Sequence, residues 1–447
     1  MKRIVWIILL LMASLGTDAS AQSRGSYFFG NSLLRSKLNP AFAPESNYAS
    51  LPLVGSLSAD FASNVGLKNF VFPEGDANYL FLNDIVPADT FLSELPSRDP
   101  YLQERVESDL FNFGMKIGSY GYATLSLSLV ESGNITLSGD LLRFIKAGSS
   151  AVPGSFEGGS AELAAYTALS AGYAHDLSSL VEGLQAGLRI KLLSGLAAGR
   201  FSIDHLGMQL SPERISAGVH GSGSLSGIGY SPNEGFSLSR LGNCSIGMAA
   251  DIGVSYRRPM DGPWTVCGIE LSASVCDLGG IRYSHDLSSL LLDNQFSFQG
   301  IGDLAGEGES EGGFEQVIDD LTDLTKITSS SGEPFYYPLP ASIHVGASAQ
   351  LWQGKAHAGL LYYHAVHRSN VMIAGGVSPL EWLNLGVNWT FIGPANRLGF
   401  YAEFIPKKYI GLFLGMERAS LRSNSNHIPI RNFTQSIAFG VNVLFGD

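Results

Sequence analysis

The feature of this sequence that most constrains its fold is a two-residue alternation between apolar residues and small or polar residues. One example places large apolar residues at every second position: Leu383, Leu385, Val387, Trp389 and Phe391. Similar segments lie at 51–61, 111–129, 184–192, 246–256, 343–351 and 437–445. Successive side chains of a strand point to opposite faces, so this pattern predicts many strands, each with one apolar face.

The composition of the chain indicates that these strands lie in a membrane. Charged residues make up 15% of the chain, against about 25% in soluble domains. Opposite the apolar face the segments carry Gly, Ser, Thr and Asn, as a barrel interior requires. The segments are long enough to cross a bilayer at a tilt, and closure removes the open edges that lipid does not tolerate. We therefore predict an all-β fold, a closed antiparallel transmembrane β-barrel of about 14 strands.

The first 21 residues have the pattern of a secretory signal peptide. Lys2 and Arg3 precede an apolar run, and small residues at 19–21 supply a cleavage site between Ala21 and Gln22. The run is shorter than the ~20 residues that a membrane-spanning helix needs, and no later apolar stretch reaches that length. Together with the strands, these features predict export to the cell outer membrane. A soluble secreted β protein is the alternative.

The rest of the chain divides into an N-terminal segment and the barrel. Residues 22–48 contain no good strand, and Pro40 and Pro44 cannot lie in a central strand. We expect this segment to pack inside or against the barrel like a hatch, with Asn39 hydrogen-bonded to barrel backbone near the periplasmic half. The barrel is predicted over residues 49–447, with long loops at 70–108 and 300–335.

Both long loops leave alternatives open. Residues 70–108 are rich in apolar and aromatic residues, which fits either an extracellular lid or hydrophobic capture site, or a loop that packs on itself. A short helix is expected at 99–108. Residues 303–323 contain eight acidic residues and no Lys or Arg. A calcium site is one interpretation of this acidic run. A solvated loop with an amphipathic helix is the other, because no EF-hand ligand loop is present.

The last strand is predicted to direct assembly of the barrel. Its apolar face carries Phe439, Val441, Val443 and Phe445, and small or polar residues lie between them. A terminal strand with an apolar outer face and a near-terminal aromatic residue resembles the strand by which outer-membrane barrels are recognised for assembly. We therefore expect these four residues to face lipid.

The sequence offers no catalytic or metal-binding constellation. The cysteines Cys244, Cys267 and Cys276 form no CxxC pair. His-Asp pairs recur in two similar octapeptides at 173–180 and 283–290, but no nucleophile elbow accompanies them, and two similar turns at equivalent barrel ends explain the repeat. A net charge of −12 excludes a basic footprint for nucleic acid. We predict no enzyme activity, cofactor, metal or nucleic-acid partner.

A family resemblance rests on short motifs along the chain. The Asn39-Pro40-Ala41 tripeptide before the first long strand resembles the N-terminal signature of the long-chain fatty acid transporter superfamily. The longer run Leu38–Pro44 is similar to uncharacterised outer-membrane members from Bacteroidota, as are segments at 275–279 and 378–386. The resemblance implies a fourteen-stranded barrel whose N-terminal segment folds inward as a hatch. It carries over no ligand contacts.

Two functions follow as expectations. The first is an outer-membrane barrel that binds or passes hydrophobic small molecules. The second is a non-transporting scaffold or accessory subunit of an envelope secretion or motility system. The expected partners are outer-membrane lipids, the barrel-assembly machinery and a hydrophobic ligand, with secretion-system proteins in the second case.

Overall fold

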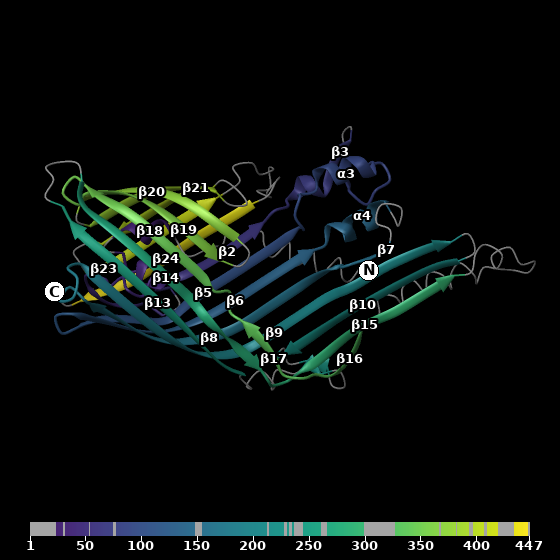
Figure 1. The fold of residues 1–447 in the computed structure, drawn as a ribbon, viewed down its shortest axis with the longest axis horizontal. Helices are drawn as coiled ribbons and strands as arrows, with labels where there is room; N and C mark the ends of the chain where they lie inside the picture. Colours follow the sequence, from purple (N-terminus) through teal and green to yellow (C-terminus); the bar gives the residue numbers. More distant parts are fainter. Residues whose placement is uncertain are drawn as a thin grey trace, which may run out of the picture.

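The computed structural model describes residues 24–29, 32–52, 54–74, 77–147, 154–211, 214–227, 230–231, 235–236, 245–260, 266–298, 327–365, 368–380, 382–392, 397–405, 409–418 and 433–445. These residues form a closed antiparallel β-barrel of 14 strands, seen from the side in Figure 1. The predicted fold class is therefore confirmed. No helix among the described residues is long and apolar enough to cross a membrane.

Each barrel strand pairs with its neighbours in chain order, so the wall is a simple meander. The first strand has two parts, β1 (Asn47–Ser50) and β2 (Leu57–Ser63). The others are β5 (Tyr101–Ile117), β6 (Gly121–Leu137), β8 (Gly159–Asp176), β9 (Leu184–Ser211), β13 (Ser245–Pro259), β14 (Val266–Tyr283), β18 (Ser342–Leu351), β19 (Ala356–Ala365), β20 (Arg368–Leu380), β21 (Leu383–Ile392), β22 (Arg397–Phe404), β23 (Ile410–Arg418) and β24 (Phe433–Phe445).

The barrel closes where the last strand pairs with the first. Tyr48 lies opposite Leu444, and Leu57 lies opposite Phe439. The strand expected over 51–61 is interrupted between β1 and β2. Gly55 explains the interruption, because a Cβ at this position would lie 2.1 Å from the Cβ of Ser50. The alternating sequence does not reveal this tight excursion, which needs a residue without a side chain.

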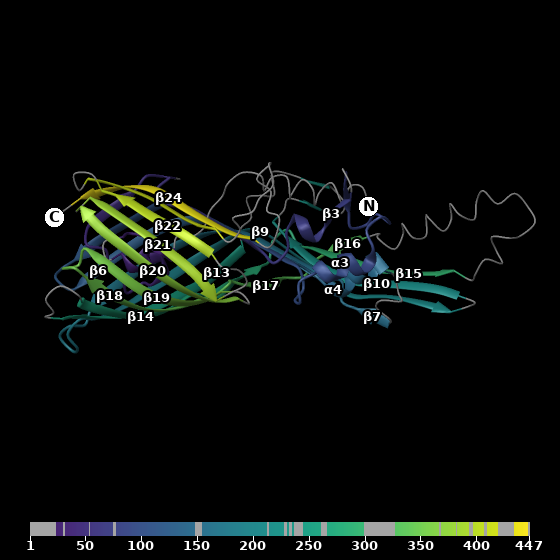
Figure 2. The ribbon, with the colours of Figure 1, turned by 90° about the horizontal axis from the view of Figure 1, so that it is seen from above.

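The two ends of the barrel differ. At one end short turns join β5 to β6 and β18 to β19, and the chain finishes there with β24. At the other end β9 continues beyond the barrel. There it pairs with β10 (Arg214–Ser226), which pairs with β15 (Ser288–Phe298), and β15 pairs with β16 (Thr328–Ser331). Figures 1 and 2 show this sheet, called the wing, extending away from the barrel.

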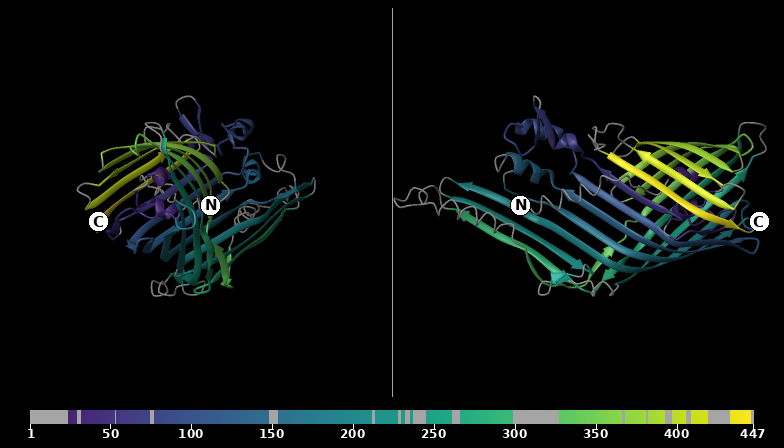
Figure 3. Two further views of the ribbon diagram at one scale, coloured as in Figure 1. Left: turned by 60° about the vertical axis from the view of Figure 1, so that its left-hand side comes forward. Right: turned by 180° about the vertical axis from the view of Figure 1, so that it is seen from behind.

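A small subdomain, called the cap, also lies at the end opposite the short turns, called the long-loop end (Figure 3). It contains η2 (Leu67–Asn69), β3 (Val71–Glu74), β4 (Ala77–Leu80), α3 (Ala88–Glu94) and α4 (Gly139–Ala147). Phe91, Val86 and Leu142 form its core, with further aromatic residues from 70–81 packed around them. Residues 70–100 therefore pack on themselves, one of the two alternatives for this region. The remaining short elements are β7 (Gly154–Phe156), β11 (Tyr230–Ser231), β12 (Gly235–Phe236) and β17 (Phe335–Pro338).

The structure corrects three expected boundaries. Residues 101–108 belong to β5 and pair with β6, so neither the expected loop end at 108 nor a helix at 99–108 is present. The predicted N-terminal segment ends before β1 at Asn47 rather than at 48. Residues 328–331 and 335 of the loop expected at 300–335 lie in strands. Within that loop, 300–326 lies outside the described residues, as do the signal peptide, the acidic run at 303–323 and Cys244.

The two faces of the wall differ as the alternation predicts. In β21, Val387 and Trp389 are exposed on the outer surface, whereas Asn388 and Thr390 between them are buried toward the lumen. At the short-turn end the outer surface also exposes aromatic residues: Tyr120, Tyr173, Trp352, Trp382, Phe404, Tyr409 and Phe445. An apolar belt bordered by aromatic residues matches the hydrocarbon and interfacial layers of a bilayer.

Candidate functional site: the N-terminal segment in the lumen

Residues 24–46, called the lumenal segment, lie across the interior of the barrel. The segment contains η1 (Arg24–Phe28) and α2 (Arg35–Leu38), and nearly all of its described residues up to Phe42 are buried. Its hydrogen bonds and ion pairs reach β2, β5, β6, β9, β13, β14 and β22. Its aromatic side chains lie against β18 to β21. The segment thus contacts the wall on all sides.

The Asn39-Pro40-Ala41 tripeptide fixes the centre of the segment to two strands. The Asn39 amide donates to the carbonyl oxygens of Val254 in β13 (3.2 Å) and Ala273 in β14 (3.3 Å). Its side-chain oxygen accepts a hydrogen bond from the backbone N–H of Ala41 (2.9 Å). The predicted hydrogen bonds from Asn39 to barrel backbone are therefore present, in the half of the barrel nearer the short turns.

The carbonyl of Leu38 adds two further bonds next to this tripeptide. The Ser274 hydroxyl donates to it at 2.7 Å, and the Cys276 thiol donates to it at 3.4 Å. Cys267 and Cys276 are both free. The buried Cys276 therefore contacts the lumenal segment rather than forming a disulfide.

Glycines on the inner face of the wall make room for the segment. A Cβ at Gly253 would lie 2.0 Å from the side-chain oxygen of Asn39, and a Cβ at Gly187 would lie 2.2 Å from the backbone of Pro40. Similar conflicts with Tyr27, Phe28 or Phe29 would occur at Gly346, Gly359, Gly376 and Gly386. From the sequence alone, these glycines indicate only an inner face of small residues. Which of them the segment covers is a long-range property that local spacing does not carry.

Aromatic side chains fill the lumen between the segment and the wall. Tyr27 lies edge-on to Phe28 and to Phe42, with ring centroids 5.3 and 5.1 Å apart. The ring centroid of Phe29 lies 4.2 Å from that of His357 and 5.1 Å from that of Tyr401. One cluster contains Tyr27, Phe28 and Phe42 together with Leu38, Leu361, Tyr363, Met372 and Ala374. The part of the lumen between these aromatic residues and strands β18 to β22 is therefore packed and largely apolar.

Three cations tie the segment to carboxylates of the wall. The Lys37 ammonium lies 2.9 Å from Glu107 and 2.8 Å from Asp109. Arg35 pairs with Glu270 and also stacks over Phe42. The Arg24 guanidinium lies 3.6 Å from the Asp60 carboxylate.

Burial alone would lower the pKa of Lys37, but the carboxylates of Asp109 and Glu107 outweigh the effect of burial and raise the pKa above the usual lysine value. Lys37 is therefore charged when docked.

The wall carries its own ion-pair network beside the segment. Asp251 accepts from Arg189 (3.2 Å) and pairs with Lys191 (2.9 Å), which also pairs with Asp277 (2.6 Å). Arg189 additionally donates to the carbonyl of Ser36 at 2.6 Å. The network thus extends from the strands into the lumenal segment.

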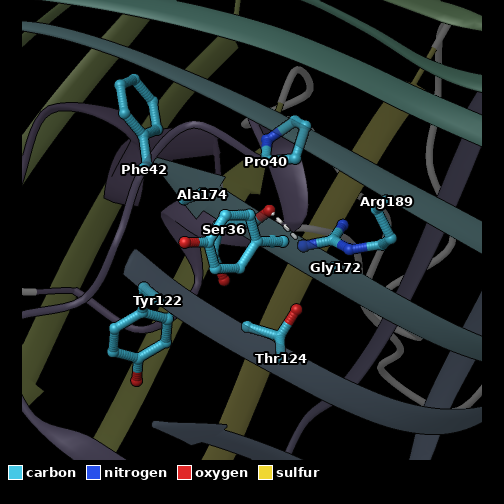
Figure 4. Close-up of a pocket in the computed structure, with 9 residues that line it drawn as sticks. Ser36, Pro40, Phe42, Tyr122, Thr124, Gly172, Ala174 and Arg189 are labelled. Carbon is cyan, nitrogen blue, oxygen red and sulfur yellow. Dashed lines mark hydrogen bonds between the residues drawn. The ribbon is translucent and has the colours of Figure 1, made fainter. Parts of the chain in front are cut away.

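A small pocket remains between the segment and strands β6, β8 and β9. Figure 4 shows Ser36, Pro40 and Phe42 of the segment on one side, and Tyr122, Thr124 and Arg189 of the wall around it. The dashed line marks the hydrogen bond from the Arg189 guanidinium to the Ser36 carbonyl. The walls combine apolar surface with one guanidinium group, so the pocket is amphipathic.

The other predicted site residues lie away from the lumen. On β24, Phe439, Val443 and Phe445 are exposed on the outer surface, and Val441 shares their face. Their role in assembly stays a prediction. The described residues contain no group of three His, Cys, Asp or Glu side chains that could hold a metal.

The interpretation of the two octapeptides as turns at equivalent barrel ends is wrong. Residues 173–176 end β8 at the short-turn end, whereas Tyr283 ends β14 at the long-loop end. Asp176 accepts a hydrogen bond from the backbone N–H of Ser178 at 2.8 Å, so this Asp caps its own turn.

A closed antiparallel barrel with an apolar outer belt and a packed polar-lined interior is the architecture of transmembrane β-barrels of the outer membrane. The chain belongs to the Family of unknown function (DUF5723), whose profile matches residues 40–416. No curated protein matches the sequence.

Several solved structures are similar to this chain. The TodX deltaS2S3 mutant monoaromatic hydrocarbon channel is 12% identical, with 96% of each chain covered and a TM-score of 0.47. The Ralstonia pickettii toluene transporter TbuX is 11% identical, with 96% of this chain and 95% of that chain covered and a TM-score of 0.41. The Pseudomonas putida toluene transporter TodX is 10% identical, with the same coverage and a TM-score of 0.32.

Proposed function

We propose that the protein is an outer-membrane barrel that binds or passes hydrophobic small molecules, with the lumenal segment as its hatch. The buried aromatic side chains of Tyr27, Phe28, Phe29 and Phe42 in the lumen support this most strongly. A general porin keeps a water-filled lumen. A lumen packed with aromatic side chains instead favours molecules that can replace those apolar contacts.

The sequence motifs support a finer assignment within this proposal. On the Leu38–Phe42 run, LNPAF, we propose that the chain is a member of the long-chain fatty acid transporter-like superfamily, close to its uncharacterised Bacteroidota members. The contacts of Asn39 and Leu38 with β13 and β14 give this run a physical reason, since it fixes the hatch to the wall.

A scaffold function in an envelope secretion or motility system is the second candidate. The cap and the wing favour it, because both extend beyond the barrel and offer surface that a pore does not need. Under either function we expect the outer belt to contact outer-membrane lipids and β24 to be recognised by the barrel-assembly machinery. Secretion-system proteins would be partners only of the scaffold.

Mass spectrometry of molecules retained by the barrel separates the two functions. The full-length protein is purified from native membranes in a mild detergent and extracted, beside an unrelated outer-membrane barrel prepared in the same way. We expect one class of hydrophobic molecule at about one copy per barrel, because the buried aromatic side chains of the lumen would retain an apolar ligand. An empty barrel that co-purifies with other envelope proteins would support the scaffold instead.

A further inference from the structure

The wall of the lumen has an excess of acidic groups. Among the described strand residues whose side chains are buried or ion-paired toward the lumen there are eight carboxylates and five cations. The carboxylates are Asp60, Glu107, Asp109, Asp251, Glu270, Asp277, Glu403 and Glu417. The cations are Arg105, Arg189, Lys191, Arg257 and Arg397. The formal charge of this wall is therefore −3.

The lumenal segment supplies the missing charge. Its buried cations are Arg24, Arg35 and Lys37, and its one carboxylate, Glu45, is exposed. Each cation pairs with a wall carboxylate on a different strand: β2, β14 and β5. The docked segment thus neutralises the wall, and an undocked segment would leave it with net negative charge.

Asp109 shows how specific this compensation is. The Asp109 side chain is fully buried. Among the described residues, Lys37 provides the one cation within ion-pair distance of this carboxylate. Hydrogen bonds from Asn112 (3.0 Å) and Ser128 (2.8 Å) hold the carboxylate in place, and neither brings a charge. Without Lys37, a buried carboxylate would remain with no cation, which is strongly unfavourable.

Glu417 on β23 is a carboxylate that receives no hydrogen bond even with the segment docked. Only 1% of this residue is exposed, and neither carboxylate oxygen has a hydrogen-bond partner. It lies on the row that faces the lumen, opposite Gly399 of β22 and Ser436 of β24. A buried acceptor without a donor indicates a place where a cationic or proton-donating group would be favoured.

The contacts of the segment also indicate what kind of cation fits. Arg35 places its guanidinium 3.7 Å from the Phe42 ring while it pairs with Glu270. Phe42 in turn packs with Tyr27 in the apolar cluster. The wall therefore receives positive charge immediately beside an apolar body, which is the arrangement of an amphiphilic amine.

We propose that the lumen selects amphiphiles with a cationic head over amphiphiles with an anionic head. This inference rests on the proposed function, in which a hydrophobic ligand takes over space held by the lumenal segment. When the segment leaves its docked position, the positive charge of Lys37 or Arg35 leaves the wall, and a protonated amine takes its place. The hydrocarbon tail of the amine then replaces the contacts that the aromatic side chains of the segment make with the wall. A carboxylate in the same place would meet a wall that is already acidic.

Three probes with one hydrocarbon chain test this selectivity: dodecylamine, dodecanol and dodecanoate. The full-length protein is placed in nanodiscs of zwitterionic lipid, and the probe retained per barrel is measured by mass spectrometry after subtraction of empty nanodiscs. We expect about tenfold more dodecylamine than dodecanoate, equivalent to about 1.4 kcal/mol, with dodecanol between them. The variant Glu107→Gln/Asp109→Asn should bring the amine and the carboxylate close to equal and leave dodecanol unchanged.

The exposed Asp204→Asn in the wing is the matched control and should keep the wild-type preference. Heat-modifiable migration on gels checks that each variant folds, and if the double variant does not fold, the wild-type ratio decides the proposal. Retention of dodecanoate equal to or above that of dodecylamine by the wild type would overturn the selectivity and leave the hydrophobic-ligand function standing. Retention of none of the three probes would instead contradict the proposed function itself.

Discussion

Asn39 illustrates how a single residue can anchor a segment inside a barrel. Its side chain uses both donor and acceptor groups, on Val254, Ala273 and Ala41, and the residue is fully buried. The contact depends equally on Gly253, because any side chain there would occupy the space of the Asn39 oxygen. The anchor is therefore a pair of positions, one on the segment and one on the wall.

At this scale we predict that Asn39→Ala weakens docking of the lumenal segment. The change leaves buried groups without partners, so we expect a loss of about 1–3 kcal/mol in the free energy of unfolding. Urea titration of the folded barrel on gels measures it. Asn83→Ala, whose side chain bonds only within an exposed loop of the cap, is the control and should change stability by less than about 0.5 kcal/mol. Equal stability of Asn39→Ala and wild type would contradict the anchor.

The sequence predicts the strands well because alternation is a local property of the chain. In β21, Leu385 and Val387 are exposed and Asn384 and Asn388 are buried, as their spacing requires. The break at 51–56 and the extension of β9 into the wing are not predictable in this way. Both depend on which neighbour a strand meets, at Gly55 and beyond Gly195.

The candidate site is likewise predictable from the sequence only in part. The prolines Pro40 and Pro44 exclude a strand locally, so a plug-like segment could be predicted. The carboxylates that receive Lys37 and Arg35 lie 70 or more residues away in the chain. Local spacing cannot identify such partners, and the lumen charges therefore emerge only from the fold.

Among the elements, β24 gives the most direct test of membrane insertion. Replacing Phe439, Val441 and Val443 with Asp puts three acids on the outer face that carries the apolar belt. Each charge near the midplane costs on the order of 2–4 kcal/mol for basic residues and somewhat less for acids. We expect little or no protein in the outer-membrane fraction.

The matched control for β24 replaces the same three residues with Ala, which keeps the face uncharged and should retain most of the barrel. Fractionation and heat-modifiable migration report both results. Wild-type yield of the Asp variant in the membrane would mean that this face does not contact lipid.

The whole molecule is a closed wall with one end of short turns and one end that carries the cap and the wing. The lumenal segment crosses the interior and contacts strands around the circumference, so the charge balance, the glycines and the aromatic cluster all depend on its position. These three features fit the proposed hatch, in which the docked segment closes the barrel and a ligand would enter when the segment moves.

Single-channel conductance in planar bilayers tests this account most directly. The intact protein should show conductance near zero, because the lumenal segment fills the lumen. Deletion of residues 24–42 should produce stable ion currents, and the control Asp204→Asn should remain closed. Large, stable currents from the intact protein would contradict the claim that the segment closes the barrel, as would a folded deletion variant that does not conduct.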